Sequence, residues 1–287
     1  MFRFLKELFN HFFSSSTFQK GATLAYYAVF SLLPMIVIVT SFLGLFFGKQ
    51  AVSGEIYTQL KDSLGVEAAV QIQDIIRQQH TEHNSVVTAI LGFVTLGLSA
   101  SGMFNQIHNS FNTIWDIKAK PKSSILRYVT KHFFSFTILI VLFFVMLASA
   151  AINSFLVKHA RSLSTDYELH YLYEHLVSFV VMGIAFAIMF KFLGDARVHW
   201  KAALLGGAFT SLLFLFGKVG IASYIGHSHL STTFGSASVL ALLMLWVYYT
   251  SQIIFLGASF VKIISSRMGH EILPNSNAVK IKKVEIE

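Results

Sequence analysis

Long apolar stretches without charge alternate with shorter basic segments along this chain. A helix needs about 20 mostly apolar residues to cross a bilayer, and six stretches reach or approach that length. They occupy residues 22–47, 86–104, 133–157, 176–190, 202–225 and 235–261. The fourth would be about 23 Å long at 1.5 Å per residue, so its ends must snorkel or the bilayer must thin. The pattern predicts an all-α polytopic membrane protein with six transmembrane helices.

The remaining segments divide the chain into three parts. In residues 1–20, Phe2, Leu5 and Phe9 recur at helical spacing, which predicts an N-terminal interfacial amphipathic helix. Residues 21–265 form the six-helix transmembrane domain. Within it, residues 49–84 carry apolar residues at helical spacing and predict an external helical loop that caps the bundle. Residues 266–287 are charged and predict a flexible cytoplasmic tail.

Composition supports lipid as the main solvent of the chain. Hydrophobic residues make up 54% of the 287 residues and charged residues only 13%, about half the share of a soluble domain. This excludes most soluble enzymes. Cysteine is absent, which excludes disulfides, thiol nucleophiles and cysteine-based metal sites.

The net charge of +8 is an orientation signal. Lys and Arg concentrate in the N-terminal segment, the 105–132 and 191–201 loops and the tail. The other side holds only Lys49, Lys61, Arg77, Lys158 and Arg161. The positive-inside rule therefore places both termini in the cytoplasm. A basic inner surface attracts anionic lipid headgroups. The net positive charge of the chain is thus explained without nucleic-acid binding.

The second span continues beyond the hydrocarbon as a two-faced helix. Asn105, His108, Asn109 and Asn112 fall on one side, and apolar residues fall on another. Two interpretations are open: a polar stripe that faces an inward-open cavity, or a helix end that is polar because it is wet.

Other polar candidates lie inside the spans. Lys218 in the fifth span either snorkels to the outer surface or faces a cavity, with Tyr224 nearby. In the sixth span, Tyr248 and Gln252 lie one turn apart. A buried Gln needs a partner, so Gln252 either joins helices or lines a cavity.

Three stretches resemble the YihY or BrkB family of bacterial inner-membrane proteins, formerly labelled ribonuclease BN. The first runs Lys20-Gly-Ala-Thr-Leu-Ala-Tyr-Tyr-Ala-Val-Phe-Ser-Leu-Leu-Pro34, and the second runs from Ser99 to Trp115. The third comprises Phe234-Gly-Ser, Leu243-Met-Leu-Trp-Val-Tyr248 and Leu256-Gly-Ala258. Together they span about residues 20 to 262. One position departs from the family pattern, because Ser259 stands where the family usually has Glu.

The resemblance implies a six-helix protein of the bacterial cell inner membrane, associated with virulence and with proposals of envelope-lipid transport. The residues themselves argue against the ribonuclease label. A metal-dependent nuclease needs converging carboxylates or histidines, whereas the acidic residues of the cytoplasmic side are scattered along the sequence. We therefore expect no enzyme activity, catalytic residue, cofactor or metal.

Two classes of function follow. The first is a transporter or flippase of an amphipathic, anionic lipid-like envelope molecule; the second is a non-transporting membrane scaffold for envelope assembly. A membrane-bound ribonuclease is a distant third. The expected partners are anionic membrane lipids, without nucleic acid, and homo-oligomerisation is left open. The residues expected to contact substrate or line a cavity are Lys218, Tyr224, Tyr248, Gln252, Asn105, His108, Asn109 and Asn112.

Overall fold

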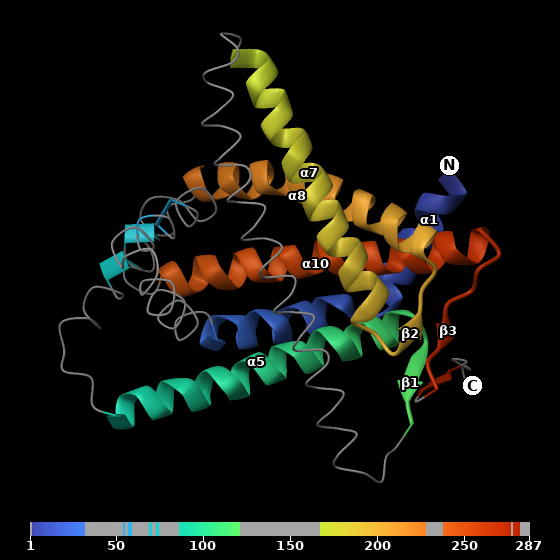
Figure 1. Ribbon diagram of the computed structural model, residues 1–287, viewed down its shortest axis with the longest axis horizontal. Coiled ribbons are helices and arrows are strands. Elements are labelled where there is room, and N and C mark those ends of the chain that lie inside the picture. Colours follow the sequence, from blue (N-terminus) through green and yellow to red (C-terminus); the bar gives the residue numbers. More distant parts are fainter. Residues whose placement is uncertain are drawn as a thin grey trace. The chain divides into compact units, whose positions relative to one another are not determined.

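The computed structural model describes residues 2–31, 86–120, 167–227, 238–276 and 278–281, with isolated positions between 54 and 74. These residues are mostly helical (Figure 1). The third predicted span, the second half of the first span and nearly all of the external loop lie outside the described residues.

Four long helices carry the apolar stretches that the structure describes. They are α5 (Val86–Ile114), α7 (Tyr167–Phe192), α8 (Trp200–His227) and α10 (Ser238–Arg267). A shorter helix, α1, covers Phe2–Ser14, and residues 17–31 are also helical. Among the described residues, two segments are long and apolar enough to cross a membrane, Trp200–Lys218 and Leu240–Arg267, and Ser178–Phe192 is a shorter apolar helix. The six-span topology stays a prediction.

The chain separates into two compact units. Unit 1 comprises Met1–Thr17, Ile107–Leu215 and Ile253–Glu287; unit 2 comprises Phe18–Gln106 and Phe216–Gln252.

Glycines set the packing of α7, α8 and α10 in unit 1. A Cβ on Gly207 would lie 2.2 Å from the carbonyl oxygen of Gly183, and one on Gly206 would lie 2.1 Å from Val261 Cγ2. Small residues let helix backbones approach closely, which is how helices associate in a membrane. We call Gly183, Gly206, Gly207 and Gly257 the glycine seam.

Large aromatic side chains fill the core beside this seam. Trp115, Phe111, Phe190 and Phe255 are fully buried. The ring centroids of Phe111 lie 5.2 Å from Trp115 and 5.6 Å from Phe190. These contacts join the end of α5 to α7.

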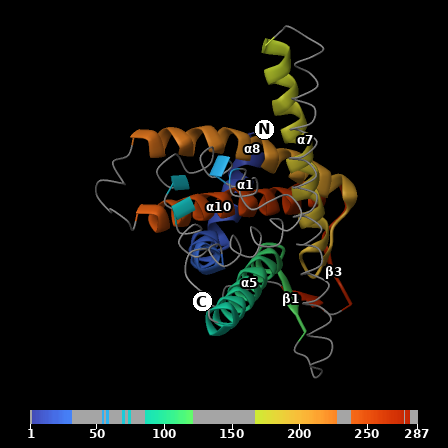
Figure 2. The same cartoon turned by 60° about the vertical axis from the view of Figure 1, so that its left-hand side comes forward.

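The segment after α10 forms strands, whereas we expected a flexible tail from 266 to 287. Strand β3 (Leu273–Pro274) pairs antiparallel with β2 (Ala196–Arg197), and β4 (Ala278–Lys280) pairs with β1 (Ile117–Ala119). These strands lie where the chain leaves α5 and α7 (Figures 1 and 2). The expectation was wrong up to Ile281, because the connections after α5 and α7 carry backbone groups that need partners. The two small sheets also add β structure to the all-α prediction.

The turns before these strands contain residues with a left-handed backbone conformation. Gly269 follows the last turn of α10 with φ 73°, and the His270 N–H reaches the Ser265 carbonyl at 3.0 Å. This is a glycine C-cap that ends the helix. Asp116 adopts φ 55° after α5, and its carbonyl accepts the Ile281 N–H at 2.7 Å.

Unit 2 is also joined by contacts at glycines. A Cβ on Gly21 would lie 2.0 Å from Gln252 Nε2, one on Gly102 would lie 2.5 Å from the Tyr27 ring, and one on Gly217 would lie 2.0 Å from the Tyr249 hydroxyl. Here a large polar or aromatic side chain covers each glycine.

Candidate functional site

A buried polar cluster lies where α5 ends, and it joins residues far apart in the sequence. Asn112 Nδ2 donates to Asp195 Oδ2 at 3.1 Å, and Asn112 Oδ1 accepts the Asp195 backbone N–H at 2.8 Å. His108 Nε2 lies 3.4 Å from Asp195 Oδ2. The three residues are 5–6% exposed. We call His108, Asn112 and Asp195 the buried cluster.

The buried cluster holds the α7–α8 connection against α5. Gly194 precedes Asp195, and a Cβ there would lie 2.5 Å from the Trp115 ring. The Trp115 indole in turn donates to the Ala258 carbonyl of α10 at 3.0 Å. A buried carboxylate must be hydrogen-bonded or paired, and Asn112 and His108 meet that need. The geometry thus explains why polar residues are buried at this end of α5.

Ion pairs attach α1 and α5 to α10. Lys262 Nζ lies 2.6 Å from Asp116 Oδ2 and 2.8 Å from His11 Nε2. Near the end of α10, Arg267 pairs with Glu7 at 2.7 Å. These pairs place a group of charges at the strand-bearing end of unit 1.

The two sides of the amphipathic helix α1 differ in their exposure. Leu8 and Phe12 are buried, whereas Phe9 and Phe13 are 48% and 58% exposed. One side of the helix therefore packs on unit 1, and an aromatic side remains available. Its placement in the membrane interface stays a prediction.

A cavity of about 470 Å³ opens beside the buried cluster. It is lined by Asn109, Asn112, Thr113, Asp116, Ile117, Lys118, Ala119 and Ile281. Two residues of the predicted polar stripe, Asn109 and Asn112, thus line one cavity.

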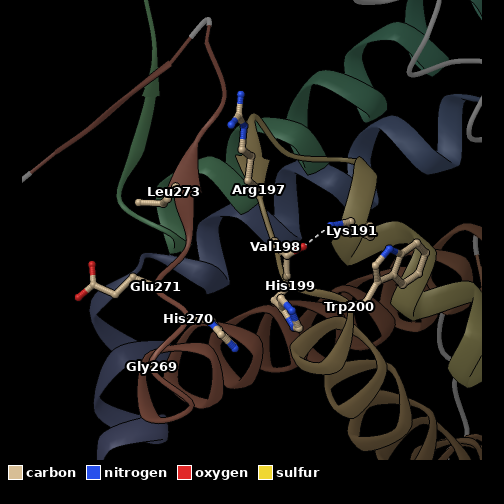
Figure 3. Close-up of a pocket in the computed structure, with 9 residues that line it drawn as sticks. All are labelled: Lys191, Arg197, Val198, His199, Trp200, Gly269, His270, Glu271 and Leu273. Carbon is tan, nitrogen blue, oxygen red and sulfur yellow. Dashed lines mark hydrogen bonds between the residues drawn. The ribbon is translucent and has the colours of Figure 1, made fainter.

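A second cavity, which we call the basic pocket, has a volume of about 550 Å³. It is lined by Lys191, Arg197, Val198, His199, Trp200, Gly269, His270, Glu271 and Leu273 (Figure 3). The residues come from the end of α7, from β2, from the start of α8 and from the turn after α10. The polar segments at several helix ends thus converge here.

Aromatic and imidazole rings shape the basic pocket. The rings of His199 and His270 stack with centroids 4.4 Å apart and planes 19° apart. Lys191 Nζ donates to the Val198 carbonyl and lies 5.5 Å from the Trp200 ring centroid. Figure 3 shows the two imidazoles close together and Lys191 beside Trp200.

Glu271, the acidic residue that lines the basic pocket, is paired with Lys280, which lies outside the pocket. Glu271 accepts a hydrogen bond from Lys280 Nζ at 2.5 Å. This hydrogen bond, with the positive charge of Lys280, lowers the pKa of Glu271 below its ordinary value of 4.5. The carboxylate is therefore ionised and already paired at neutral pH.

The structure distributes the other predicted site residues over several places. Asn105 is half-buried on α5, and His108 belongs to the buried cluster. Lys218 is exposed on α8, where Leu212 and Phe216 are also exposed. Tyr248 is half-buried on α10, and the side chain of Tyr224 lies outside the described residues.

Gln252 packs against Gly21, as the close approach of its Nε2 shows. This is the contact that a role in joining helices requires. Gln252 and Lys218 line neither of the two cavities described above.

Several candidate residues were not identified from the sequence. The sequence assigns no site role to Asp195, Lys262, Lys191, His199 or His270. A signal was present, because Gly194-Asp195 and Gly269-His270 each follow an apolar helix within a few residues. Among the described residues, no group of three or more His, Asp and Glu could hold a metal ion.

Comparison with known proteins identifies the family. The profile of the family described as Virulence factor BrkB matches residues 8–282. The chain is similar to UPF0761 membrane proteins of Saccharophagus degradans (23% identical, covering 92% of this chain and 60% of that protein), Stenotrophomonas maltophilia strain K279a (25%, 88% and 58%) and Pseudoalteromonas atlantica (24%, 91% and 85%).

The chain spans about 60% of the length of the first two of these relatives. No solved structure matches it. Because the family profile covers nearly the whole chain, and because the relatives are named membrane proteins, this chain is an integral membrane protein of the virulence factor BrkB family.

Proposed function

We propose that this protein moves an anionic, lipid-like envelope molecule across the bacterial inner membrane. The observation that carries the proposal is the position of Lys218. It is exposed on α8 at the end of Trp200–Lys218, a segment long and apolar enough to cross a membrane. A cation beside hydrocarbon is costly unless water or an anion accompanies it. An anionic headgroup would pair with Lys218 while its acyl chains stay in hydrocarbon.

Two lysines of α8 lie about one hydrocarbon thickness apart along the helix. Trp200 and Lys201 begin the helix, and Lys218 lies about 27 Å along it at 1.5 Å per residue. This length is close to the thickness of the hydrocarbon core. A headgroup would therefore find a cation near each surface of the membrane.

A scaffold for envelope assembly is the second candidate, and the packing of unit 1 favours it. The glycine seam and the buried aromatic side chains leave the helices in close contact. A tightly packed group of helices can offer a binding surface to partner proteins without conducting a substrate across the membrane.

The orientation is tested by cysteine labelling, because the chain has no native cysteine. Single cysteines replacing Ser53 and Ser162 should react with an impermeant thiol reagent in intact cells, and one replacing Ser123 should not. The reverse pattern would contradict cytoplasmic termini.

Translocation is tested with purified protein in phosphatidylcholine vesicles that contain fluorescent phosphatidylglycerol. We expect dithionite to quench more label than in protein-free vesicles, and less extra quenching with Lys218→Ala than with Lys218→Arg. The control variant is Lys6→Ala, which removes an exposed lysine of α1. Quenching equal to that of protein-free vesicles would reject transport of this lipid and favour the scaffold.

Co-purified acidic lipid, measured by mass spectrometry, tests the binding step alone. Lys218→Ala should retain less of it than Lys218→Arg, at matched thermal stability. Equal retention by both variants and the wild type would leave Lys218 as a snorkelling residue.

A further inference from the structure

The charged residues of the basic pocket indicate which kind of ligand it attracts. Lys191 and Arg197 line it as cations, and His199 and His270 add two imidazole rings that can donate hydrogen bonds. The one acid that lines the pocket, Glu271, is held by Lys280 at 2.5 Å, and Figure 3 shows its carboxylate directed away from the imidazoles. The pocket therefore attracts an anion.

The surroundings of the pocket indicate that the anion has an apolar part. Trp200 and Phe192 are 47% and 42% exposed, and their rings meet edge to face at 5.8 Å. Beyond Trp200, the exposed side of α8 carries Leu204 and Leu205. Exposed aromatic rings at the end of an apolar helix are typical of the membrane interface. The cations thus lie at headgroup depth, next to a surface that suits acyl chains.

Hydrogen-bond donors are directed into the pocket from two sides. His199 Nδ1 accepts the Lys201 backbone N–H at 3.4 Å, which leaves Nε2 as the ring nitrogen that can donate to a ligand. Lys191 uses one N–H on the Val198 carbonyl, and an ammonium has three. A phosphoryl oxygen accepts from both kinds of donor.

The two imidazoles of the pocket stack on each other, with ring centroids 4.4 Å apart. The charged groups around the pair are Lys191 from α7, Arg197 from β2 and Glu271 after α10, with Lys280 bound to Glu271. An anion beside the stacked rings would therefore lie among the cations of the pocket.

We propose that the basic pocket binds the phosphoryl headgroup of an anionic lipid at the membrane interface. Lys191 and the two imidazoles contact the phosphoryl oxygens, Arg197 adds charge at the rim, and Trp200 lies beside the start of the acyl chains. This deepens the proposed function and rests on it for the statement that the anion is a lipid.

The test is binding by the full-length protein in detergent, followed by native mass spectrometry and thermal stabilisation. The ligands are phosphatidic acid, phosphatidylcholine, glycerol 3-phosphate and inorganic phosphate. We expect phosphatidic acid to bind more tightly than phosphatidylcholine, and the two soluble phosphates to bind more weakly than phosphatidic acid. Inorganic phosphate that binds as tightly as phosphatidic acid would overturn the lipid assignment.

Three variants and a control locate the site. Arg197→Gln should weaken phosphatidic acid binding roughly two- to fivefold, because it removes one positive charge at the exposed rim, and Arg197→Lys, which keeps the charge, should restore part of it. His270→Gln should also weaken phosphatidic acid binding, because it removes one of the two imidazoles that contact the phosphoryl oxygens. The control is Lys118→Gln, an exposed lysine of β1 that lines the other cavity. Wild-type affinity in both Arg197→Gln and His270→Gln would overturn the site.

Failure of this inference is distinguishable from failure of the proposed function. Tight, Arg197-dependent binding without translocation in vesicles would keep the pocket and reject transport. Translocation with wild-type lipid affinity in Arg197→Gln would keep transport and reject the pocket.

Discussion

Unit 1 is held together in two different ways, by the glycine seam and by the strand-bearing end. In the seam, α7, α8 and α10 touch because Gly183, Gly206 and Gly207 have no side chains. At the strand-bearing end, the buried cluster and the ion pairs of Lys262 and Arg267 supply directional bonds. Inside lipid, water cannot replace a lost hydrogen bond, so close packing serves better there.

The largest effect is expected from filling the seam. Gly207→Ala should lower stability by about 3 kcal/mol, because the new methyl would meet the Gly183 carbonyl at 2.2 Å and backbone cannot move aside cheaply. The measurement is thermal unfolding of purified protein in detergent. The control on the same helix is Gly220→Ala, where a Cβ has nothing within 4 Å. Equal melting temperatures for the two variants would contradict the seam.

The second-largest loss of stability is expected from a substitution in the buried cluster. Asn112→Ala should cost about 2 kcal/mol, because it removes two hydrogen bonds to Asp195 and leaves a buried carboxylate with fewer partners. Asn109→Ala, which truncates an exposed residue of the same helix, should change stability by no more than about 0.5 kcal/mol. A similar loss for both would mean that the cluster does not hold the α7–α8 connection.

The ion pairs should contribute less. Lys262→Met should lower stability by about 1 kcal/mol, because its partner Asp116 is 27% exposed and partly solvated. Arg267→Met breaks a more exposed pair with Glu7 and should cost about 0.5 kcal/mol or less. Added salt should weaken the exposed Arg267–Glu7 pair more than the Lys262–Asp116 pair. A larger loss for Arg267→Met would reverse the ranking by burial.

The smallest effect is expected from lowering the pH, which weakens the pairing within the segment after α10. The lowered pKa of Glu271 means that its pairing with Lys280 stabilises the fold above the ordinary carboxyl pKa of 4.5. That contribution disappears as the pH falls through the lowered value. Hydrogen exchange of the β4 amides, corrected for the intrinsic rate, should therefore accelerate at acid pH. Glu271→Gln should remove this additional acceleration, and an unchanged acid response would contradict the assignment to Glu271.

The apolar helices could be predicted from the sequence because their signal is local. The stretch 176–190 lies within α7, and the continuation of the second span past Asn105 is part of α5. The prediction placed His108 and Asn112 on one side of that helix, and both belong to the buried cluster.

The strands and the basic pocket could not be predicted, because each depends on contacts distant in sequence. Strands of two or three residues carry no hydrophobic period. The partner of Asn112 is Asp195, and the ring that stacks on His199 belongs to His270. Such pairs follow only once the ends of α7 and α10 are known to converge.

The pairing of β1 with β4 has a consequence for the order of synthesis. Ala119 pairs with Ala278, so β1 must wait for its partner while the intervening chain is made. At 5–20 residues per second, the wait is about 8 to 30 s. During that time β1 is an open strand edge, the kind of surface that joins other chains. The exposed Lys118 on the strand and Lys120 just after it would repel a second nascent copy until β4 arrives.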